Sequence, residues 1–155
     1  MIIDIAQKED IEGILKLLVQ VNQIHADGRP DIFKNGGVKY VYEDILKKLN
    51  SHNEIILVAR EEGKVLGYAF LIIEDIEETD NLRKRRELYI DDLCVDENER
   101  GRHIGKELFD AVKIKAVELK AYHITLRVWE FNKEAILFYR SMGMQPLFTE
   151  MEFMI

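Results

Sequence analysis

One stretch of the sequence, residues 87–108, joins an apolar segment to a helical one through a short turn. Residues 87–95 are rich in apolar and β-favouring side chains, which is typical of a strand inside a sheet. After the turn, apolar residues recur with helical spacing at Ile104, Leu108, Val112, Ala116 and Leu119. This order of strand, turn and helix constrains the fold more than any other part of the chain.

The turn between these two elements has the composition of an anion-binding loop. It contains Gly101 and Gly105 together with Arg100 and Arg102. Glycine permits positive φ angles and has no Cβ that would keep a phosphate away from the main chain. Successive backbone N–H groups, followed by a helix N-terminus, can then bind a small anion. The turn therefore predicts a site for a diphosphate.

Known phosphate-binding loops narrow this prediction. The turn lacks the Gly-Lys-Ser/Thr ending of a Walker A loop and the three spaced glycines of a dinucleotide-binding fingerprint. It resembles the pyrophosphate loop of the GNAT acetyltransferase superfamily, which reads Arg/Gln-x-x-Gly-x-Gly/Ala. Arg100, Ile104 and Gly105 fit that pattern, whereas His103 replaces its first glycine. A Cβ is tolerated at His103 if the backbone is already helical there.

A second segment resembles the other cofactor motif of this superfamily. Asn132, Ala135, Phe138-Tyr139 and Gly143 follow its order and spacing. Asn132 is a favourable helix N-cap, and Gly143 is favourable just beyond a helix C-terminus. About two helical turns separate Asn132 from Tyr139, so both side chains can face one cleft. The alternative is a plain amphipathic helix with Tyr139 in the core. The resemblance to GNAT proteins covers essentially the whole chain.

The composition is that of one globular domain, which we expect to span residues 1–155. The net charge of −7 argues against nonspecific nucleic-acid binding and modestly favours a cationic substrate. The sequence shows neither a signal peptide nor a membrane-spanning apolar run, and we expect a cytoplasmic protein. The single cysteine, Cys94, is expected to be a small buried residue rather than a nucleophile. The scattered histidines predict no metal site.

The order of expected elements is β-α-α-β-β-β-α-β-α-β. It comprises a first strand at the N-terminus, helices over 11–22 and 38–49, a hairpin of strands 55–59 and 65–76, a charged tip over 75–86, the strand 87–95, a helix from Ile104, a strand over 123–128, a helix from Asn132 and strand-like residues 144–155. This order is the one the GNAT fold shows. We therefore expect the α/β class, with a mixed, mostly antiparallel central sheet flanked by helices.

The resemblance implies acetyl-CoA as co-substrate and assigns residues to it. The main chain of Leu93, Cys94 and Val95 is expected to separate from its neighbouring strand and pair with the pantetheine arm, and one of these N–H groups to polarise the thioester oxygen. The other expected cofactor-binding residues are Arg100, Gly101, Arg102, His103, Ile104, Gly105, Lys106, Asn132 and Tyr139. Tyr139 is the expected general acid, because an unperturbed phenol with a pKa near ~10 is protonated at neutral pH.

Two consecutive aspartates supply candidates for the catalytic base. Asp91 and Asp92 interrupt an otherwise apolar strand, and in regular geometry their side chains point to opposite faces. The segment Tyr89-Ile90-Asp91-Asp92 resembles the Tyr-Leu-Glu-Asp segment of polyamine acetyltransferases, which makes Asp91 the first choice as base, acting through water, and Asp92 the second. The alternative is that either carboxylate binds a backbone N–H or a neighbouring arginine.

The acceptor is expected to be set by the first two helices and the loop between them. His25, Asp27 and Phe33, with Asp91, are the predicted substrate-binding residues. The first hypothesis is acetylation of a small primary amine, such as a polyamine or an amino-acid-like molecule. The alternatives are acetylation of a protein N-terminus or lysine, and a non-catalytic module that senses acetyl-CoA. A homodimer through the last strand or a helix is expected by analogy, and no nucleic-acid or membrane partner is expected.

Overall fold

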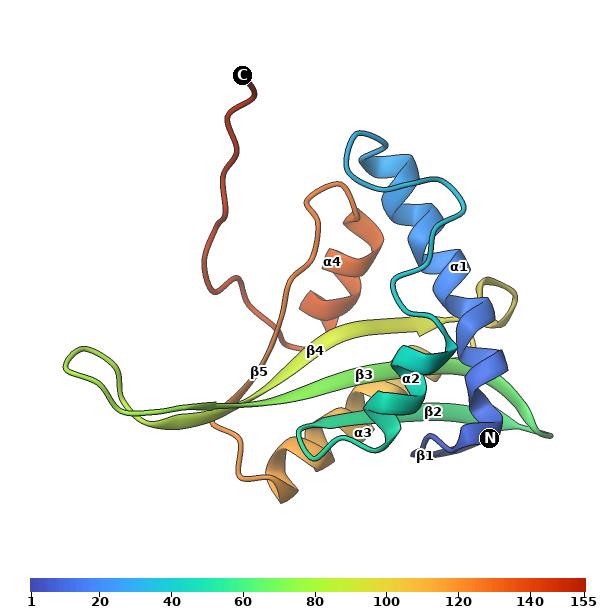
Figure 1. Ribbon diagram of the computed structural model, residues 1–155, viewed down its shortest axis with the longest axis horizontal. Coiled ribbons are helices and arrows are strands. Elements are labelled where there is room, and N and C mark those ends of the chain that lie inside the picture. Colours follow the sequence, from blue (N-terminus) through green and yellow to red (C-terminus); the bar gives the residue numbers. More distant parts are fainter.

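A central sheet with strand order β1-β2-β3-β4-β5 runs through the protein, whose computed structural model describes all 155 residues (Figure 1). The strands are β1 (Ile2–Ile5), β2 (Glu54–Glu61), β3 (Lys64–Ile76), β4 (Arg85–Val95) and β5 (His123–Leu126). Neighbours from β1 to β4 pair antiparallel, and β5 alone pairs parallel with β4. The predicted α/β class with a mixed, mostly antiparallel sheet is confirmed.

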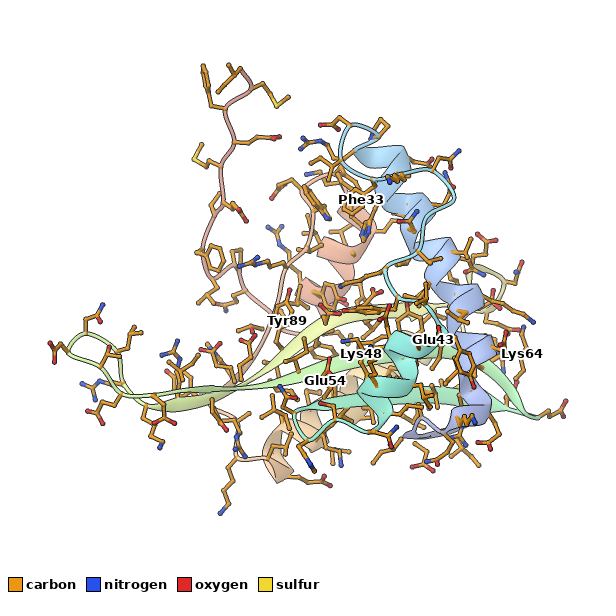
Figure 2. All side chains as sticks on the ribbon, viewed as in Figure 1. Phe33, Glu43, Lys48, Glu54, Lys64 and Tyr89 are labelled. Atoms are coloured by element: carbon orange, nitrogen blue, oxygen red, sulfur yellow. The ribbon has the colours of Figure 1, made fainter.

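Helices cover both faces of this sheet and bury two separate cores. The helices are α1 (Ile11–Gly28), α2 (Tyr42–Leu49), α3 (Ile104–Glu118) and α4 (Lys133–Ser141), with short 3-10 turns η1 (Lys8–Asp10) and η2 (Glu97–Glu99). One core joins α1 and α2 to the sheet through residues such as Leu18, Ile45 and Tyr68. The other lies under α3 and includes Leu88 and Phe109. Lys48 of α2 and Glu54 of β2 form an ion pair at the margin of the first core (Figure 2).

Turn chemistry explains how β2 and β3 connect. Glu62 and Gly63 both have positive φ angles, 49° and 78°, which is the geometry of a two-residue hairpin turn that matches the twist of the strands. The predicted hairpin is therefore confirmed. The predicted charged tip connects β3 to β4. At its base, Arg86 of β4 pairs with Asp75 of β3 at 2.7 Å.

A β-bulge in β4 decides which face each side chain of this strand takes. Phe70 of β3 pairs with Asp92, but Leu71 pairs with Ile90, so Asp91 is an extra residue in β4. The expected alternation through the two aspartates is therefore wrong. Before the bulge, Leu88 and Ile90 face the α3 core; after it, Leu93 and Val95 take that face, and Cys94 packs with Tyr68 on the other side. Asp91 and Asp92 thus both face the side of α1 and α2.

The parallel pairing between β4 and β5 is short. It runs from Glu87 opposite His123 to Ile90 opposite Leu126 and ends there, although β4 continues to Val95. The two strands therefore part next to the bulge, and one edge of residues 91–95 has no strand beside it. This is the separation that was predicted for residues 93–95, and Figure 1 shows α4 beyond the end of β5.

The turn from β4 to α3 contains two residues in left-handed conformation. Gly101 has φ 81°, and His103 has φ 61° and ψ 12° as the residue preceding α3. The helical backbone that would accommodate a side chain at His103 is therefore absent. A left-handed L-residue costs roughly 1–2 kcal/mol, although histidine enters this region more often than most residues. The loop pattern that this turn resembles has glycine at this position, and glycine has no Cβ to oppose a positive φ angle.

Both predicted caps of α4 are present. The Asn132 side chain accepts a hydrogen bond from the Ala135 N–H at 3.2 Å, as an N-cap does. At the other end, Gly143 has φ 93°, and the N–H of Met144 donates to the Tyr139 carbonyl at 3.0 Å. This is the Schellman arrangement, which satisfies carbonyls at the end of a helix. The caps fix the two-turn distance between Asn132 and Tyr139.

Several element boundaries differ from the prediction. Strand β5 ends at Leu126 instead of residue 128, and β4 begins at Arg85 instead of Glu87. Helix α1 runs to Gly28 instead of Asn22, because no helix-breaking residue occurs between Asn22 and Gly28. Helix α2 begins at Tyr42, after a loop that includes Val38. Residues 144–155 form no strand, so the prediction of a last strand is wrong for the single chain. A strand needs a neighbour, and residues 144–155 pair with none, although the outer edge of β5 is free.

Replacing His103 by glycine should raise the free energy of unfolding by up to ~1 kcal/mol, because relief of left-handed strain exceeds the added entropy of the unfolded chain. His103→Val should lower it by about 1–2 kcal/mol, because β-branched residues tolerate positive φ poorly. Urea unfolding followed by circular dichroism measures both. Equal stability of the glycine and valine variants would contradict the strained geometry.

Candidate active site

The turn before α3 presents backbone donors that the protein itself does not use. The N–H groups of Arg100, Gly101, Arg102 and His103 donate to no acceptor in the chain. The next three, from Ile104 to Lys106, belong to the first turn of α3, where helical N–H groups have no helical acceptor. Consecutive free N–H groups at the positive end of a fifteen-residue helix have the geometry that suits an anion.

The basic side chains of this loop are mostly paired with carboxylates. Arg102 bonds to Glu99 and, at 2.8 Å, to Glu61, while Lys106 pairs with Asp110 at 2.7 Å. The Arg100 guanidinium is half-exposed and lies 3.6 Å from Glu134, so its ion pair is the loosest. An anion at this turn would therefore be bound first by the main chain. Arg100 is the basic side chain that can turn toward the anion with the smallest loss of an existing ion pair.

The open edge of β4 offers further main-chain groups. The Asp96 N–H donates to the Leu66 carbonyl of β3 at 2.8 Å. Because amides alternate between the two edges of a strand, those of Leu93 and Val95 point away from β3, toward the gap left by β5. Cys94 is 7% exposed, and burial raises the pKa of its thiol to about 12. The interpretation of Cys94 as a small buried residue is confirmed.

Helix α4 packs against the start of α3. A Cβ on Gly105 would lie 3.3 Å from the Phe138 ring, so the glycine allows these two helices to approach closely. The Asn132 amide keeps its Nδ2 group without a partner in the protein, since its oxygen alone caps the helix. The sequence motif thus brings the start of α3, Asn132 and Tyr139 onto one side of the gap between β4 and β5.

The Tyr139 side chain sits in apolar surroundings with a free hydroxyl. Its ring centroid lies 6.3 Å from that of Phe109, and its hydroxyl makes no hydrogen bond in the protein. Burial raises the pKa of Tyr139 well above its usual value, and the charges of Asp92 and Cys94 raise it further. The phenol is therefore a proton donor at every physiological pH. The hydroxyl is not among the buried polar atoms that lack a partner, so a tyrosine that serves the core alone is also consistent with its free state.

Asp91 is held by residues of the loop before α2. Its carboxylate accepts a hydrogen bond of 2.5 Å from the Tyr40 hydroxyl and lies 2.9 Å from the Lys39 Nζ. The Lys39 ammonium also donates to the Asp91 carbonyl at 3.0 Å. These contacts fix the carboxylate while its side chain keeps 15% of its surface exposed.

Asp92 is the more buried of the two carboxylates. It accepts a hydrogen bond of 2.9 Å from the hydroxyl of Tyr68, a fully buried residue of β3. Burial raises the pKa of Asp92 to about 6, although the positive charge of Lys39 and the Tyr68 hydrogen bond act in the opposite direction. A carboxyl group with this pKa changes its protonation state close to neutral pH, which suits a group that exchanges protons.

Sequence reasoning missed the partners of both carboxylates. It proposed backbone N–H groups or an arginine, whereas the partners are Tyr40, Tyr68 and Lys39. Tyr68 carries a weak signal, since it is the one hydroxyl inside the long apolar run of β3. Lys39 and Tyr40 lie in an irregular loop, where no periodicity marks a functional residue.

Two of the predicted acceptor residues, His25 and Phe33, belong to a cluster of aromatic rings at the end of α1. The His25 ring lies 4.9 Å from Phe33, and Phe33 lies 5.5 Å from Trp129. Phe131 completes the cluster and packs so closely on Gly28 that a Cβ there would lie 2.3 Å from its ring. The cluster joins α1 to the segment between β5 and α4. Trp129 and Phe131 were not predicted for this region.

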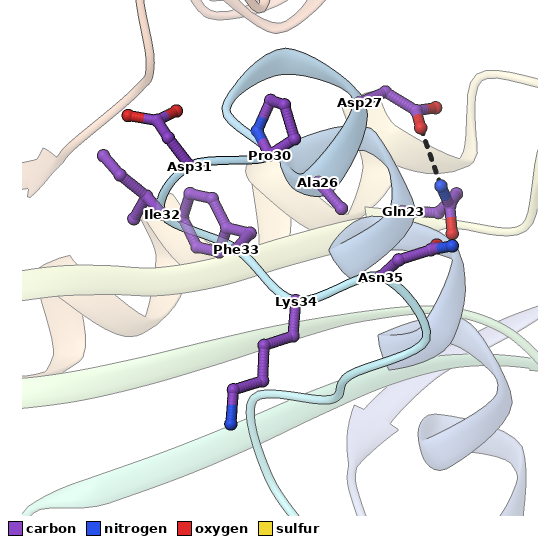
Figure 3. Close-up of a pocket in the computed structure, with 9 residues that line it drawn as sticks. All are labelled: Gln23, Ala26, Asp27, Pro30, Asp31, Ile32, Phe33, Lys34 and Asn35. Atoms are coloured by element: carbon purple, nitrogen blue, oxygen red, sulfur yellow. Dashed lines mark hydrogen bonds between the residues drawn. The ribbon is translucent and has the colours of Figure 1, made fainter.

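A pocket of about 500 Å³ lies between the last turns of α1 and the following loop (Figure 3). Asp27 and Phe33 line it, and the Asp27 carboxylate accepts a hydrogen bond from Gln23 at 2.7 Å. His25 and Asp91 do not line it. The four predicted substrate residues therefore do not form one site: Asp91 lies at the strand gap, and the other three lie at the end of α1.

Two general properties complete the description of the site. The structure contains no group of three or more histidine, cysteine, aspartate or glutamate side chains placed to bind a metal ion. None of its helices combines the length and the apolar character needed to cross a lipid bilayer.

Comparison with known proteins places this geometry in a family. The sequence profile described as the acetyltransferase (GNAT) family matches residues 18–144, which include the turn before α3, both aspartates and α4. No curated protein sequence matches the chain. Among solved structures, a point mutant of the BH1408 protein from Bacillus halodurans is 30% identical, with a TM-score of 0.96 over 100% of this chain and 99% of that chain.

Two solved aminoglycoside acetyltransferases share the fold. One, from an uncultured soil metagenomic sample and in complex with trehalose, is 21% identical, with a TM-score of 0.73 over 99% of this chain and 95% of that chain. The other, AAC(6′)-Iy in complex with CoA, is 15% identical, with a TM-score of 0.73 over 99% of this chain and 98% of that chain. Since the family profile spans most of the sequence, the chain belongs to the GNAT acetyltransferases, which use acetyl-CoA as the acetyl donor.

Proposed function

We propose that the protein transfers an acetyl group from acetyl-CoA directly to a primary amine of a small molecule. One observation carries this proposal: the bulge at Asp91 turns two carboxylates to the same side of β4 where β4 and β5 separate. The free amides before α3 follow directly on β4, and Tyr139 lies close enough to Asp92 and Cys94 for their charges to act on its hydroxyl. Together they supply an anion site, a base and an acid.

The residues around the gap fit a bound acetyl-CoA, which supplies the activated acetyl thioester. The N–H groups of residues 100–106 are suited to its diphosphate, with Arg100 as an additional charge. The outward amides of Leu93 and Val95 are suited to the pantetheine arm, and one of them to the thioester oxygen. The free Nδ2 group of Asn132 offers a further donor to the arm.

The two carboxylates take different roles toward the amine. An alkylammonium ion must lose a proton before it attacks, and Asp92 has a pKa of about 6, which suits a base that works through water near neutral pH. Asp92 is also the aspartate whose charge acts on Tyr139. Asp91 is more exposed and is oriented by Tyr40 and Lys39, so we assign it to binding the ammonium group.

Tyr139 completes the reaction as general acid. Its pKa is raised by burial, so the hydroxyl is protonated at neutral pH and can donate to the departing sulfur. As the C–S bond breaks, the proton passes from the phenol to the sulfur, the amide product and free thiol leave, and the proton that the amine gave up returns to the phenol through solvent.

The charge of the protein favours a small cationic acceptor. The net charge of −7 attracts polyamines, amino-acid-like amines and aminoglycosides alike. A protein N-terminus or lysine as acceptor, and a sensor without catalysis, remain the rival functions.

A panel of amines distinguishes these functions. The protein is incubated with acetyl-CoA and polyamines, amino acids, aminoglycosides or lysine-containing peptides, and release of free thiol is followed. We expect amine-dependent release with at least one small polycationic amine. Release with peptides alone would favour the protein acetyltransferase. Calorimetric binding of acetyl-CoA without release in any mixture would favour the sensor.

Substituting Tyr139 by phenylalanine should lower kcat by about 10²-fold or more, because the thiolate then leaves without a proton donor. The affinity for acetyl-CoA, measured by calorimetry, should change little, since the ring and its packing remain. Tyr122→Phe is the matched control, because Tyr122 is 75% exposed and outside the gap. Unchanged turnover of Tyr139→Phe would exclude this residue from the reaction.

The pH dependence should identify the base. Below a pH of about 6, the wild-type kcat/KM should fall more steeply than the fraction of free amine does, because Asp92 becomes protonated. Asp92→Asn should remove this extra fall and lower the rate by ~10²-fold. Asp91→Asn should keep the extra fall of kcat/KM at low pH, but it should raise KM for the amine by about tenfold, as loss of one charge-assisted hydrogen bond predicts. The reverse result would make Asp91 the base.

Asp92 should also make stability depend on pH. Its pKa is raised in the folded protein, so its contribution to stability is fully present below the unfolded value near ~4 and is lost as the pH rises through about 6. Relative to wild type, Asp92→Asn should gain up to ~3 kcal/mol between pH ~4 and ~7. Urea unfolding at several pH values measures this difference, and a pH-independent difference would refute the raised pKa.

A further inference from the structure

The carboxylate of Asp91 is already paired with a cation of its own chain. The Lys39 Nζ lies 2.9 Å from one carboxylate oxygen and donates to the Asp91 carbonyl at 3.0 Å, while the Tyr40 hydroxyl donates to the other oxygen. Asp91 therefore meets an incoming ammonium group with its charge largely balanced. A purely cationic acceptor, such as a polyamine, would have to come close to Lys39 and would be repelled by it.

The Lys39 ammonium has capacity left for an anion. An ammonium group has three donors, and two of these are used on Asp91. The side chain is 42% exposed, so the remaining donor is accessible. The charge also acts beyond Asp91: it opposes the rise of the Asp92 pKa, and it is the second cause, after burial, that lowers the pKa of His25. Lys39 is thus a cation that faces the candidate site.

Arg127 brings a second cation to the same region. It follows Leu126, the last residue of β5, which pairs with Ile90 directly before the bulge. Leu126 packs against the core under α3, so the next side chain takes the opposite face of the sheet, which is that of Asp91. Burial raises the pKa of the Tyr89 hydroxyl, Asp91 raises it further, and Arg127 lowers it, so both charged groups lie within reach of one phenol.

The Arg127 guanidinium has no partner in the protein. It forms no hydrogen bond and no ion pair, and the residue is exposed. Figure 2 shows Tyr89, the phenol on which its charge acts, on the side of the sheet toward α1. A guanidinium group presents five N–H donors in a planar fork that matches the two oxygens of a carboxylate. A free arginine beside Asp91 therefore suits an acceptor that carries a carboxylate.

The charges around Asp91 balance locally. The two aspartates are offset by Lys39 and Arg127, although the protein as a whole carries −7. A simple diamine would face two cations here, and a phosphate dianion would face two carboxylates. An amine that carries one carboxylate finds a partner of opposite charge for each of its groups. The arrangement therefore favours an acceptor with both kinds of charge.

We propose, on the basis of the acetyl transfer above, that the acceptor is an α-amino acid, whose carboxylate binds to Arg127 and Lys39 and whose amine binds to Asp91 and is acetylated. The C–N bond forms at this amine while the C–S bond of acetyl-CoA breaks. Asp92 takes the amine proton through water, and Tyr139 protonates the sulfur.

Two features of the acceptor follow from this placement. Amine and carboxylate must be neighbours in the acceptor, because the Lys39 Nζ touches the Asp91 carboxylate at 2.9 Å. A second amine in the side chain keeps the acceptor cationic, which suits the net charge of −7. Ornithine, a diamino acid, has both features and serves as the probe.

A pair of diamines that differ only in the carboxylate tests the role of the two cations. Ornithine is compared with ornithinamide, in which a neutral amide of the same size replaces the carboxylate, and release of free thiol from acetyl-CoA is followed with each. For the wild-type protein, kcat/KM should be at least tenfold higher for ornithine. The α-amine of the amide is the less basic one, so amine basicity alone would favour the amide.

Substitution of the cations should change this preference. Lys39→Gln and Arg127→Gln should each lower kcat/KM for ornithine by about tenfold, mainly through KM, because a charge-assisted bond to the carboxylate is lost. Lys39→Gln should also raise kcat/KM for ornithinamide, since a like charge beside Asp91 is removed. A merely structural role of Lys39 would lower both values together. Arg83→Gln is the matched control: Arg83 is exposed at the tip between β3 and β4, has no ion pair, and should leave both values unchanged.

Fragmentation of acetylated ornithine in a mass spectrometer locates the acetyl group, which should be on the α-nitrogen. Acetylation of the side-chain nitrogen overturns the placement of the carboxylate beside the reacting amine. Equal use of ornithinamide and ornithine, or an unchanged preference in both variants, overturns the assignment of Lys39 and Arg127 and leaves the proposed acetyl transfer standing. Absence of thiol release with every amine overturns the acetyl transfer itself.

Discussion

One extra residue in β4 underlies the geometry of the candidate site. The bulge at Asp91 shifts the register against β3, and close to it the pairing with β5 ends. The first effect brings Asp91 and Asp92 to one face, and the second exposes the amides of Leu93 and Val95. Without the bulge, one aspartate would face the apolar core beside α3. The local irregularity thus places the acid–base groups next to the main-chain donors.

The regular parts of this arrangement were predictable because they follow local physical rules. Apolar periodicity marks α3, turn residues mark the hairpin at Glu62-Gly63, and caps mark α4 at Asn132 and Gly143. Each of these signals is contained within a few residues, so tertiary contacts do not change it. The anion loop belongs to the same group, since free amides at a helix start depend on backbone geometry alone.

The features that escaped prediction depend on contacts distant in sequence. The bulge is a property of pairing between β3 and β4, and the sequence of β4 alone reads as a regular strand. The bonds from Tyr40 to Asp91 and from Tyr68 to Asp92 span 51 and 24 residues. The last strand was wrongly predicted for a related reason: residues 145–155 have strand-like composition, but composition does not decide whether a segment pairs with the free edge of β5.

The charges around the gap explain why main-chain groups are used for anion binding. An acidic protein with a net charge of −7 repels a diphosphate at long range, and Arg102 and Lys106 are already neutralised by carboxylates. Amide dipoles at the start of α3 act at short range and carry no net charge, so they attract the anion without weakening the acidic field that draws in a cationic amine. In the proposed reaction, an acidic surface and an anion site can therefore coexist within one molecule, with dipoles facing the anion and charges facing the cation.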